Sequence, residues 1–119
     1  MKRILVIEDN ETNMYLISFI LKENGHKVIE ARTGEEGVEL ALTEKPDLII
    51  MDIQLPGIDG LETTRLIRET KIDGNIPIVA LTSYAMTGDK ERALSAGCTG
   101  YLEKPINPDT FIDEIEEYL

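Results

Sequence analysis

The chain has 119 residues, 42% hydrophobic and 29% charged, which is enough for one domain with a real core and too few for two. Its 23 acids and 12 bases give a formal net charge of −11, and no Lys or Arg cluster could follow a phosphate backbone. This argues against direct nucleic-acid binding, with a dimer that pools the scattered basic residues as the one alternative. No apolar run approaches the roughly 20 residues of a membrane helix, and the single Cys98 excludes an internal disulfide. We expect a soluble, cytoplasmic protein with no membrane contact.

Five short apolar runs alternate with segments of helical periodicity along the chain. The runs span 4–7, 28–29, 48–51, 78–81 and, more weakly, 101–102. Such alternation is typical of parallel sheets whose strands are buried on both faces by helices. The sequence therefore predicts an α/β domain with five parallel strands.

Capping residues indicate where the helices begin and end. Side chains of Asn, Thr and Glu satisfy the first N–H groups of a helix, and glycine can adopt the left-handed conformation at its end. The expected starts are Asn10, the capping box of Thr33 and Glu36, and Asn107 with Pro108, for a last helix over 108–118. The expected ends are Asn24-Gly25 for the first helix and Ala96-Gly97 for the fourth.

Polar side chains follow the predicted strands at the edge where an open parallel sheet binds its ligands. They are Glu8, Asp9, Asp52, Thr82, Ser83 and Lys104. Three gathered acids repel one another, and desolvation increases this cost, which a hard divalent cation would relieve. Mg²⁺ prefers a few oxygen ligands together with waters and phosphate oxygens. Asp9, Asp52 and a nearby backbone carbonyl could supply these oxygens, and Glu8 could contact the ion through a water molecule.

Asp52 is the candidate nucleophile among these residues. A carboxylate can attack phosphorus and form an aspartyl phosphate, provided that cations and donors surround the equatorial oxygens. Here Mg²⁺, the Lys104 ammonium group and the Thr82 hydroxyl could fill that role. The segment 53–60 carries proline and glycine at turn positions, so its backbone can fold round the ion.

These residues, in this order, make the whole chain resemble the response-regulator receiver domains of two-component signalling. The features are Glu8-Asp9, Asp52 in an Asp-x-x-x-Pro-x-x-Asp-Gly pattern, Thr82, Tyr101 and Lys104-Pro105. The resemblance implies a flavodoxin-like, doubly wound (βα)5 sandwich with strand order 2-1-3-4-5. Residues 1–119 are then expected to form one receiver domain without an output domain. Glu8 stands where the family more often has a second aspartate.

The resemblance also implies which residues hold the phosphoryl group and the metal ion. Asp52 would be the phosphoacceptor, and Asp9, Asp52 and the Gln54 backbone carbonyl would bind Mg²⁺. Glu8 would act through a metal-bound water. A cis peptide bond is expected before Pro105, because the lysine that precedes it must point into the site.

Two further roles follow from the family pattern. Thr82 and Lys104 would contact the phosphoryl group, and Thr82 would move toward it while Tyr101 turns inward. The surface of the fourth helix, fifth strand and fifth helix would change with it.

Gln54 and Tyr84 hold positions that in this family tune the loss of the phosphoryl group, and a bulky Tyr84 would screen the aspartyl phosphate from water. We therefore expect slow self-dephosphorylation.

An aromatic pair on the first helix is a candidate docking site. The apolar stripe of this helix consists of Leu16, Ile17, Ile20 and Leu21. It leaves Tyr15 and Phe19, four residues apart, pointing away from the core. Exposed aromatic pairs can mark a surface on which a kinase or phosphotransfer helix packs, although isolated surface apolar residues are also common.

The sequence favours one function over three alternatives. It favours a stand-alone receiver that takes its phosphoryl group from a sensor histidine kinase or histidine phosphotransfer protein and binds a downstream protein. A relay intermediate that passes the group to a phosphotransfer protein is the nearest alternative. A phosphatase with an aspartyl intermediate usually has a second acid two residues after the nucleophile, where this chain has Gln54, so we expect no enzyme. A non-phosphorylated scaffold is disfavoured because every site position holds a competent residue.

Overall fold

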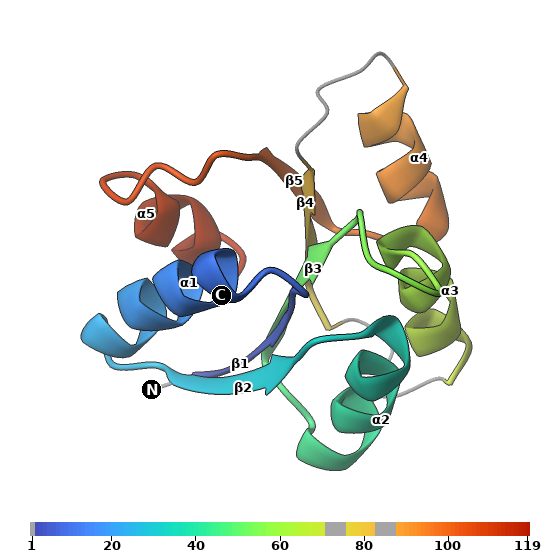
Figure 1. The fold of residues 1–119 in the computed structure, drawn as a ribbon, viewed down its shortest axis with the longest axis horizontal. Coiled ribbons are helices and arrows are strands. Elements are labelled where there is room, and N and C mark those ends of the chain that lie inside the picture. The colour runs from blue at the N-terminus through green and yellow to red at the C-terminus, as the bar shows by residue number, and fades with distance from the viewer. Residues whose placement is uncertain (1, 71–75, 83–87) are drawn as a thin grey trace.

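The fold is a five-stranded parallel sheet between two layers of helices (Figure 1). A computed structural model of the chain describes residues 2–70, 76–82 and 88–119. The strands are β1 (Arg3–Ile7), β2 (Lys27–Ala31), β3 (Leu48–Asp52), β4 (Ile78–Thr82) and β5 (Gly100–Glu103). Their order, β2-β1-β3-β4-β5, confirms the order that the family resemblance implies.

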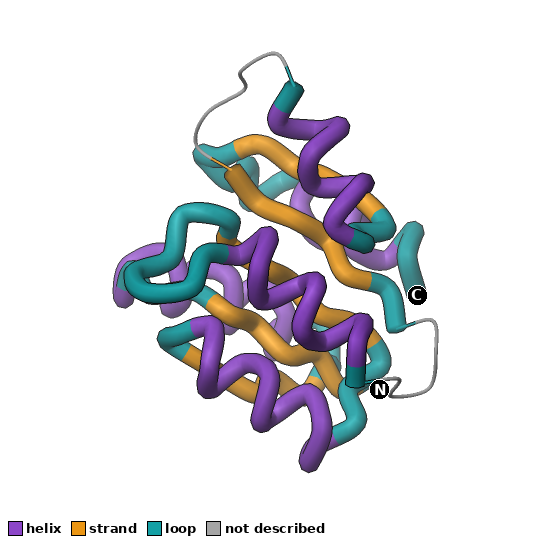
Figure 2. The backbone as a smooth tube through the Cα atoms, turned by 90° about the vertical axis from the view of Figure 1, so that its right-hand side faces the viewer, coloured by secondary structure: helices purple, strands orange, loops and turns teal. Residues whose placement is uncertain are grey.

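Helices cover both faces of the sheet (Figure 1). They are α1 (Glu11–Glu23), α2 (Gly34–Glu44), α3 (Gly60–Glu69), α4 (Asp89–Ala96) and α5 (Phe111–Glu116). Helices α1 and α5 form the first layer. Figure 2 shows the second layer, α2, α3 and α4, in front of the strands. None of the helices in the described ranges has the length and apolar character needed to cross a bilayer.

The central strands are buried on both faces because alternate side chains point to opposite layers. One core cluster takes Leu5 and Ile49 from the strands and Ala41, Ile67 and Ala93 from α2, α3 and α4. The other takes Ile4, Val6, Leu48, Ile50, Val79 and Leu81 from the strands, together with residues of α1 and α5. Continuous apolar strands are therefore explained by burial on both sides.

Most of the predicted helix boundaries are confirmed. The Asn10 side chain accepts a hydrogen bond from the Asn13 backbone N–H at 2.9 Å, and Thr33 accepts one from Glu36 at 3.1 Å. Gly25, with φ +84°, and Gly97, with φ +117°, follow the ends of α1 and α4. Glycine adopts these left-handed angles without steric cost.

The predicted start of the last helix is wrong. The sequence predicts a helix from residue 108, but α5 begins at Phe111. The Asn107 side chain accepts a hydrogen bond from the Asp109 N–H at 2.9 Å and so closes a tight turn before the helix. After α5, Tyr118 lies against Gly100 of β5, where a Cβ atom would clash with its ring.

Candidate functional site

The acidic and basic residues predicted for the site meet at the C-terminal edge of the sheet. Glu8 directly follows β1, Asp52 is the last residue of β3, and Lys104 directly follows β5. Glu8 and Asp52 are 1% and 2% exposed, whereas Asp9 is exposed beside them. Because β1 and β3 are neighbours in the sheet, their ends bring two carboxylates together where water scarcely reaches.

The Lys104 ammonium group contacts both buried carboxylates. Its Nζ atom lies 2.8 Å from Glu8 Oε1 and 3.2 Å from Asp52 Oδ1. The Lys104 backbone N–H donates to the Thr82 carbonyl oxygen at 2.7 Å, which fixes the lysine beside the end of β4. The expected cis peptide bond between Lys104 and Pro105 is present. One cation is thus shared by two carboxylates.

Burial controls the protonation of Asp52. Burial, and after it the hydrogen bond and charge of Glu8, raise the pKa of Asp52 to about 7, although Lys104 opposes the shift. Burial also lowers the pKa of Lys104, but its contacts with Glu8 and Asp52 outweigh this, so its net pKa is raised. Lys104 alone therefore does not keep Asp52 ionised below neutral pH, and a further cation close to the carboxylate would be needed to do so.

The donor set suits a hard divalent cation. One carboxylate oxygen from each of Glu8, Asp9 and Asp52 lies within 4.8 Å of the other two. Carboxylate oxygens are the ligands that Mg²⁺ prefers, and such an ion would relieve the repulsion between Glu8 and Asp52. Because Asp9 is exposed, the cluster has a side that water can reach. The acidic cluster is therefore compatible with Mg²⁺.

Gln54 lies between the candidate phosphoacceptor and the candidate switch residue. Its backbone N–H donates to Asp52 Oδ1 at 3.1 Å, and its side-chain Nε2 donates to Thr82 Oγ1 at 3.0 Å. Thr82 is fully buried at the end of β4, and Tyr101 is half-buried on the neighbouring β5. Sequence reasoning selects Gln54 for its position alone. No sequence signal predicts its side-chain contact with Thr82.

The loop between β3 and α3 depends on Asp59 and Gly60. The Asp59 side chain accepts a hydrogen bond from the Glu62 backbone N–H at 2.9 Å and so caps α3. A Cβ atom at Gly60 would clash with the backbone carbonyl oxygen of Asp52. The Asp-Gly pair of the sequence pattern therefore begins a helix and lets it start close against the end of β3.

The predicted docking pair is exposed on α1. Tyr15 is 72% exposed and Phe19 51% exposed, and their rings stack with centroids 6.2 Å apart. The buried residues of this helix are Met14, Ile17, Ser18, Ile20 and Leu21. The expected exposure of the pair is confirmed.

Two other residues from the sequence analysis, Ser83 and Tyr84, lie outside the described residues.

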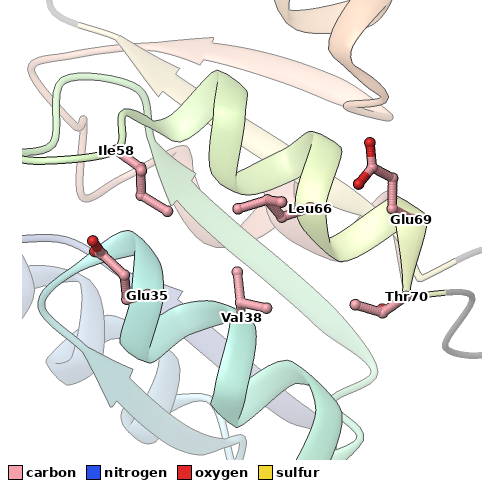
Figure 3. Close-up of a pocket in the computed structure, with 6 residues that line it drawn as sticks. All are labelled: Glu35, Val38, Ile58, Leu66, Glu69 and Thr70. Carbon is pink, nitrogen blue, oxygen red and sulfur yellow. The ribbon is translucent and has the colours of Figure 1, made fainter.

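A separate hollow of about 410 Å³ lies between α2 and α3 (Figure 3). Val38 and Leu66 point toward each other across it, and Glu35 and Glu69 lie toward opposite ends. Its lining is completed by Ile58 and Thr70. None of the site residues at the sheet edge lines this hollow. The hollow is therefore separate from the candidate site at the strand ends.

The sequence matches a known family over nearly its full length. Residues 4–116 match the family model described as the response regulator receiver domain. The chain therefore belongs to the receiver-domain family of two-component response regulators. It is 42% identical over 118 residues to the polar-differentiation response regulator DivK of Brucella ovis, a match that covers 99% of this chain and 96% of that protein.

Solved structures show the same architecture. The chemotaxis protein CheY4 of Vibrio cholerae has a TM-score of 0.94 at 28% identity, covering 100% of this chain and 99% of that one. The receiver domain of the sensor histidine kinase PA1611 from Pseudomonas aeruginosa has a TM-score of 0.90 at 35% identity, covering 98% and 96%. The PA1611 structure has a magnesium ion coordinated in its active-site cleft.

Proposed function

We propose that Asp52 accepts a phosphoryl group from a sensor histidine kinase or a histidine phosphotransfer protein. The modified domain would then bind a downstream protein through an altered surface. The observation that carries this proposal is the buried Asp52 carboxylate, contacted by the Lys104 ammonium at 3.2 Å and flanked by Glu8 and Asp9. Membership of the receiver-domain family supports it.

In the proposed reaction, an Asp52 carboxylate oxygen attacks phosphorus as the bond from phosphorus to the donor's imidazole nitrogen breaks. The bonding electron pair leaves with the imidazole. Lys104 would neutralise charge on the transferred group. Gln54 cannot act as a general acid, so this chain lacks the second acid with which a phosphatase of this type would turn over. The aspartyl phosphate is then the product.

Mg²⁺ is the proposed cofactor. Asp9 and Asp52 would bind it together with the Gln54 backbone carbonyl, and Glu8 would hold it through a water. The grouping of the three carboxylates within 4.8 Å supports their part in this set. When bound, the ion would neutralise charge on the phosphoryl oxygens. The protein itself would position the Asp52 carboxylate, through its contacts with Lys104 and the Gln54 backbone N–H.

Thr82 and Tyr101 form the proposed switch. Thr82 would move toward the phosphoryl oxygen, and Tyr101 would turn inward and change the surface of α4, β5 and α5. Their positions on the adjacent strands β4 and β5 support this coupling. One charge-assisted hydrogen bond contributes about 1.5–3 kcal/mol, which shifts a two-state population about tenfold or more. Gln54 and Tyr84 would tune how long the phosphoryl group persists.

The kinase or phosphotransfer partner is proposed to dock on α1 over Tyr15 and Phe19. Their exposure and stacking support such a contact. A second candidate function is that of a relay intermediate, which returns its phosphoryl group to a histidine phosphotransfer protein. Reverse transfer from the phosphorylated chain would separate the two. Neither function involves direct contact with nucleic acid or a membrane.

The decisive experiment is incubation with Mg²⁺ and a small phosphodonor, followed by intact-mass measurement. One phosphate should be added, and Asp52→Ala should prevent it. Chelation of the metal should also prevent it. Phosphorylation that persists in Asp52→Ala would overturn the assignment, as would multiple turnover of a phosphate monoester.

A further inference from the structure

The Gln54 carboxamide reaches a buried hydroxyl from an exposed loop. Gln54 follows β3 in the loop that leads to α3, and its Nε2 atom lies 3.0 Å from Thr82 Oγ1. Thr82 has no exposed surface. The same residue donates its backbone N–H to Asp52 Oδ1 at 3.1 Å. Gln54 therefore connects, through two hydrogen bonds, the atoms that the proposed function uses for acceptance and for switching.

The start of this loop is fixed against the strand that carries Thr82. The Ile53 backbone N–H donates to the Leu81 carbonyl oxygen at 3.0 Å, and Leu55 N–H donates to the Ile53 carbonyl at 3.1 Å. Together with the bond to Asp52, these contacts restrain the backbone on both sides of Gln54. The carboxamide is consequently presented to Thr82 from a held position.

The chemistry of the hydroxyl makes this contact specific to one arrangement. A threonine hydroxyl has one proton to donate and two lone pairs, and the Gln54 amide occupies one lone pair. Side-chain rotamers of Thr82 differ by about 120°, so a change of rotamer carries Oγ1 out of reach of an amide that is held in place. A movement of Thr82 toward Asp52 that uses such a rotation breaks the bond.

We propose that the Gln54 carboxamide is a latch that holds Thr82 in its resting position and opposes the switched state. This inference rests on the proposed roles of Asp52 and Thr82 and adds a residue that sets their coupling. The hydrogen bond between Gln54 and Thr82 forms only in the resting arrangement. A ligand that favours the switched arrangement must break it, so the bond weakens the binding of that ligand by its own free energy. Gln54 is thus a positioning residue, which acts through Thr82.

The test compares Gln54→Met with the unaltered chain in titrations with beryllofluoride, a mimic of the phosphoryl group, in the presence of Mg²⁺. Methionine is similar in length but cannot donate, and the substitution leaves the Gln54 backbone carbonyl in place. A typical net hydrogen bond corresponds to a factor of about three to ten in a population. Gln54→Met should therefore bind beryllofluoride about three to ten times more tightly. Gln54→Asn, which is one methylene too short, should do the same.

NMR resonances of the Tyr101 ring provide a readout that a merely structural role would not move. In metal-free Gln54→Met they should shift from the resting positions toward those of the beryllofluoride complex. In a Thr82→Val background, which lacks the hydroxyl, Gln54→Met should change the affinity less than twofold. Unchanged or weaker binding by Gln54→Met, with Tyr101 unmoved, would overturn the latch while leaving Asp52 as the acceptor.

Failure of the proposed function has a different signature in the same experiment. If the unaltered chain shows no beryllofluoride binding, or if Asp52→Ala binds equally well, the assignment of Asp52 is wrong and the latch falls with it. If binding depends on Asp52 but does not respond to Gln54, only the latch is wrong.

Discussion

Lys104 Nζ lies closer to Glu8 Oε1, at 2.8 Å, than to Asp52 Oδ1, at 3.2 Å. The lysine therefore balances the charge of a pair of carboxylates, and Glu8 competes with Asp52 for it. Burial is the main reason that the pKa of Asp52 is raised to about 7, and the hydrogen bond and charge of Glu8 add to this shift although an ammonium group is adjacent. Charge balance in the site is completed only when a further cation arrives.

Glu8→Gln should lower the pKa of Asp52 and weaken Mg²⁺ binding. The amide removes one negative charge, so Asp52 loses a neighbour that raises its pKa. Loss of a residue that supports metal ligands costs about tenfold or more in affinity. A metal-free pH titration followed by NMR measures the pKa of Asp52, and a Mg²⁺ titration measures the affinity for the ion. Glu117→Gln, an exposed residue near the end of the chain, should change neither. Equal Mg²⁺ affinity in Glu8→Gln would contradict a role for Glu8 at the ion.

Lys104→Met should slow phosphorylation by a small phosphodonor about 100-fold. Removal of a group that stabilises developing negative charge typically costs 10²–10³ in rate, or about 3–4 kcal/mol. The rate is measured by intact mass at saturating Mg²⁺. Lys22→Met alters an exposed lysine of α1 and should leave the rate unchanged. A Lys104→Met rate within threefold of the unaltered chain would show that Lys104 does not act on the phosphoryl group.

Without metal, the contribution of Asp52 to the free energy of unfolding should fall as the pH rises from about 4 to about 7. The folded-state pKa of Asp52, about 7, is above its ordinary value of 3.8, so the folded chain binds the proton more tightly than the unfolded chain. Asp52→Asn does not titrate. It should exceed the unaltered chain in stability at pH 8, by an amount bounded at about 4 kcal/mol, and this advantage should shrink toward pH 4.

Urea unfolding at several pH values in the presence of a chelator measures this difference. Excess Mg²⁺ should reduce the advantage of Asp52→Asn at pH 8, because the ion favours the ionised carboxylate. An advantage that is constant between pH 4 and pH 8 would show that Asp52 has an ordinary pKa.

Tyr15→Ala combined with Phe19→Ala should slow phosphotransfer from a protein donor about fivefold or more. Truncation of exposed aromatic residues at the centre of an interface commonly costs over 1 kcal/mol. Phosphorylation by a small phosphodonor should not change, because the pair lies on α1 and does not form part of the acidic cluster. Leu42→Ala, an exposed apolar residue of α2 on the other layer, is the matched control. An unaffected protein donor would make the aromatic pair incidental.

Gly100→Ala should destabilise the fold by about 1–3 kcal/mol, as is typical of an overpacked contact. A methyl group at this position meets the Tyr118 ring, which lies over β5. The free energy of unfolding in urea measures the cost. In a Tyr118→Ala background the same substitution should cost clearly less, because the obstructing ring is gone. An equal cost in both backgrounds would place the clash elsewhere.

The sequence predicts the strands and the site residues better than it predicts their contacts. The central strands are recognisable because burial on both faces makes them continuously apolar, and Asp52 and Lys104 are recognisable because they directly end or follow strands. Asn107 misleads because its side chain can close a tight turn as well as cap a helix, and the pattern is the same for both. The contact between Gln54 and Thr82 depends on rotamers, which spacing does not encode.

Glu8 and Lys104 are far apart in the sequence and meet only when β1, β3, β4 and β5 have paired in one sheet. The unfolded polypeptide therefore has no assembled cation site. A divalent ion that binds the acidic cluster should stabilise the native state in proportion to the logarithm of its concentration above the dissociation constant. The metal supply would then affect the free energy of unfolding of the protein as well as its phosphorylation.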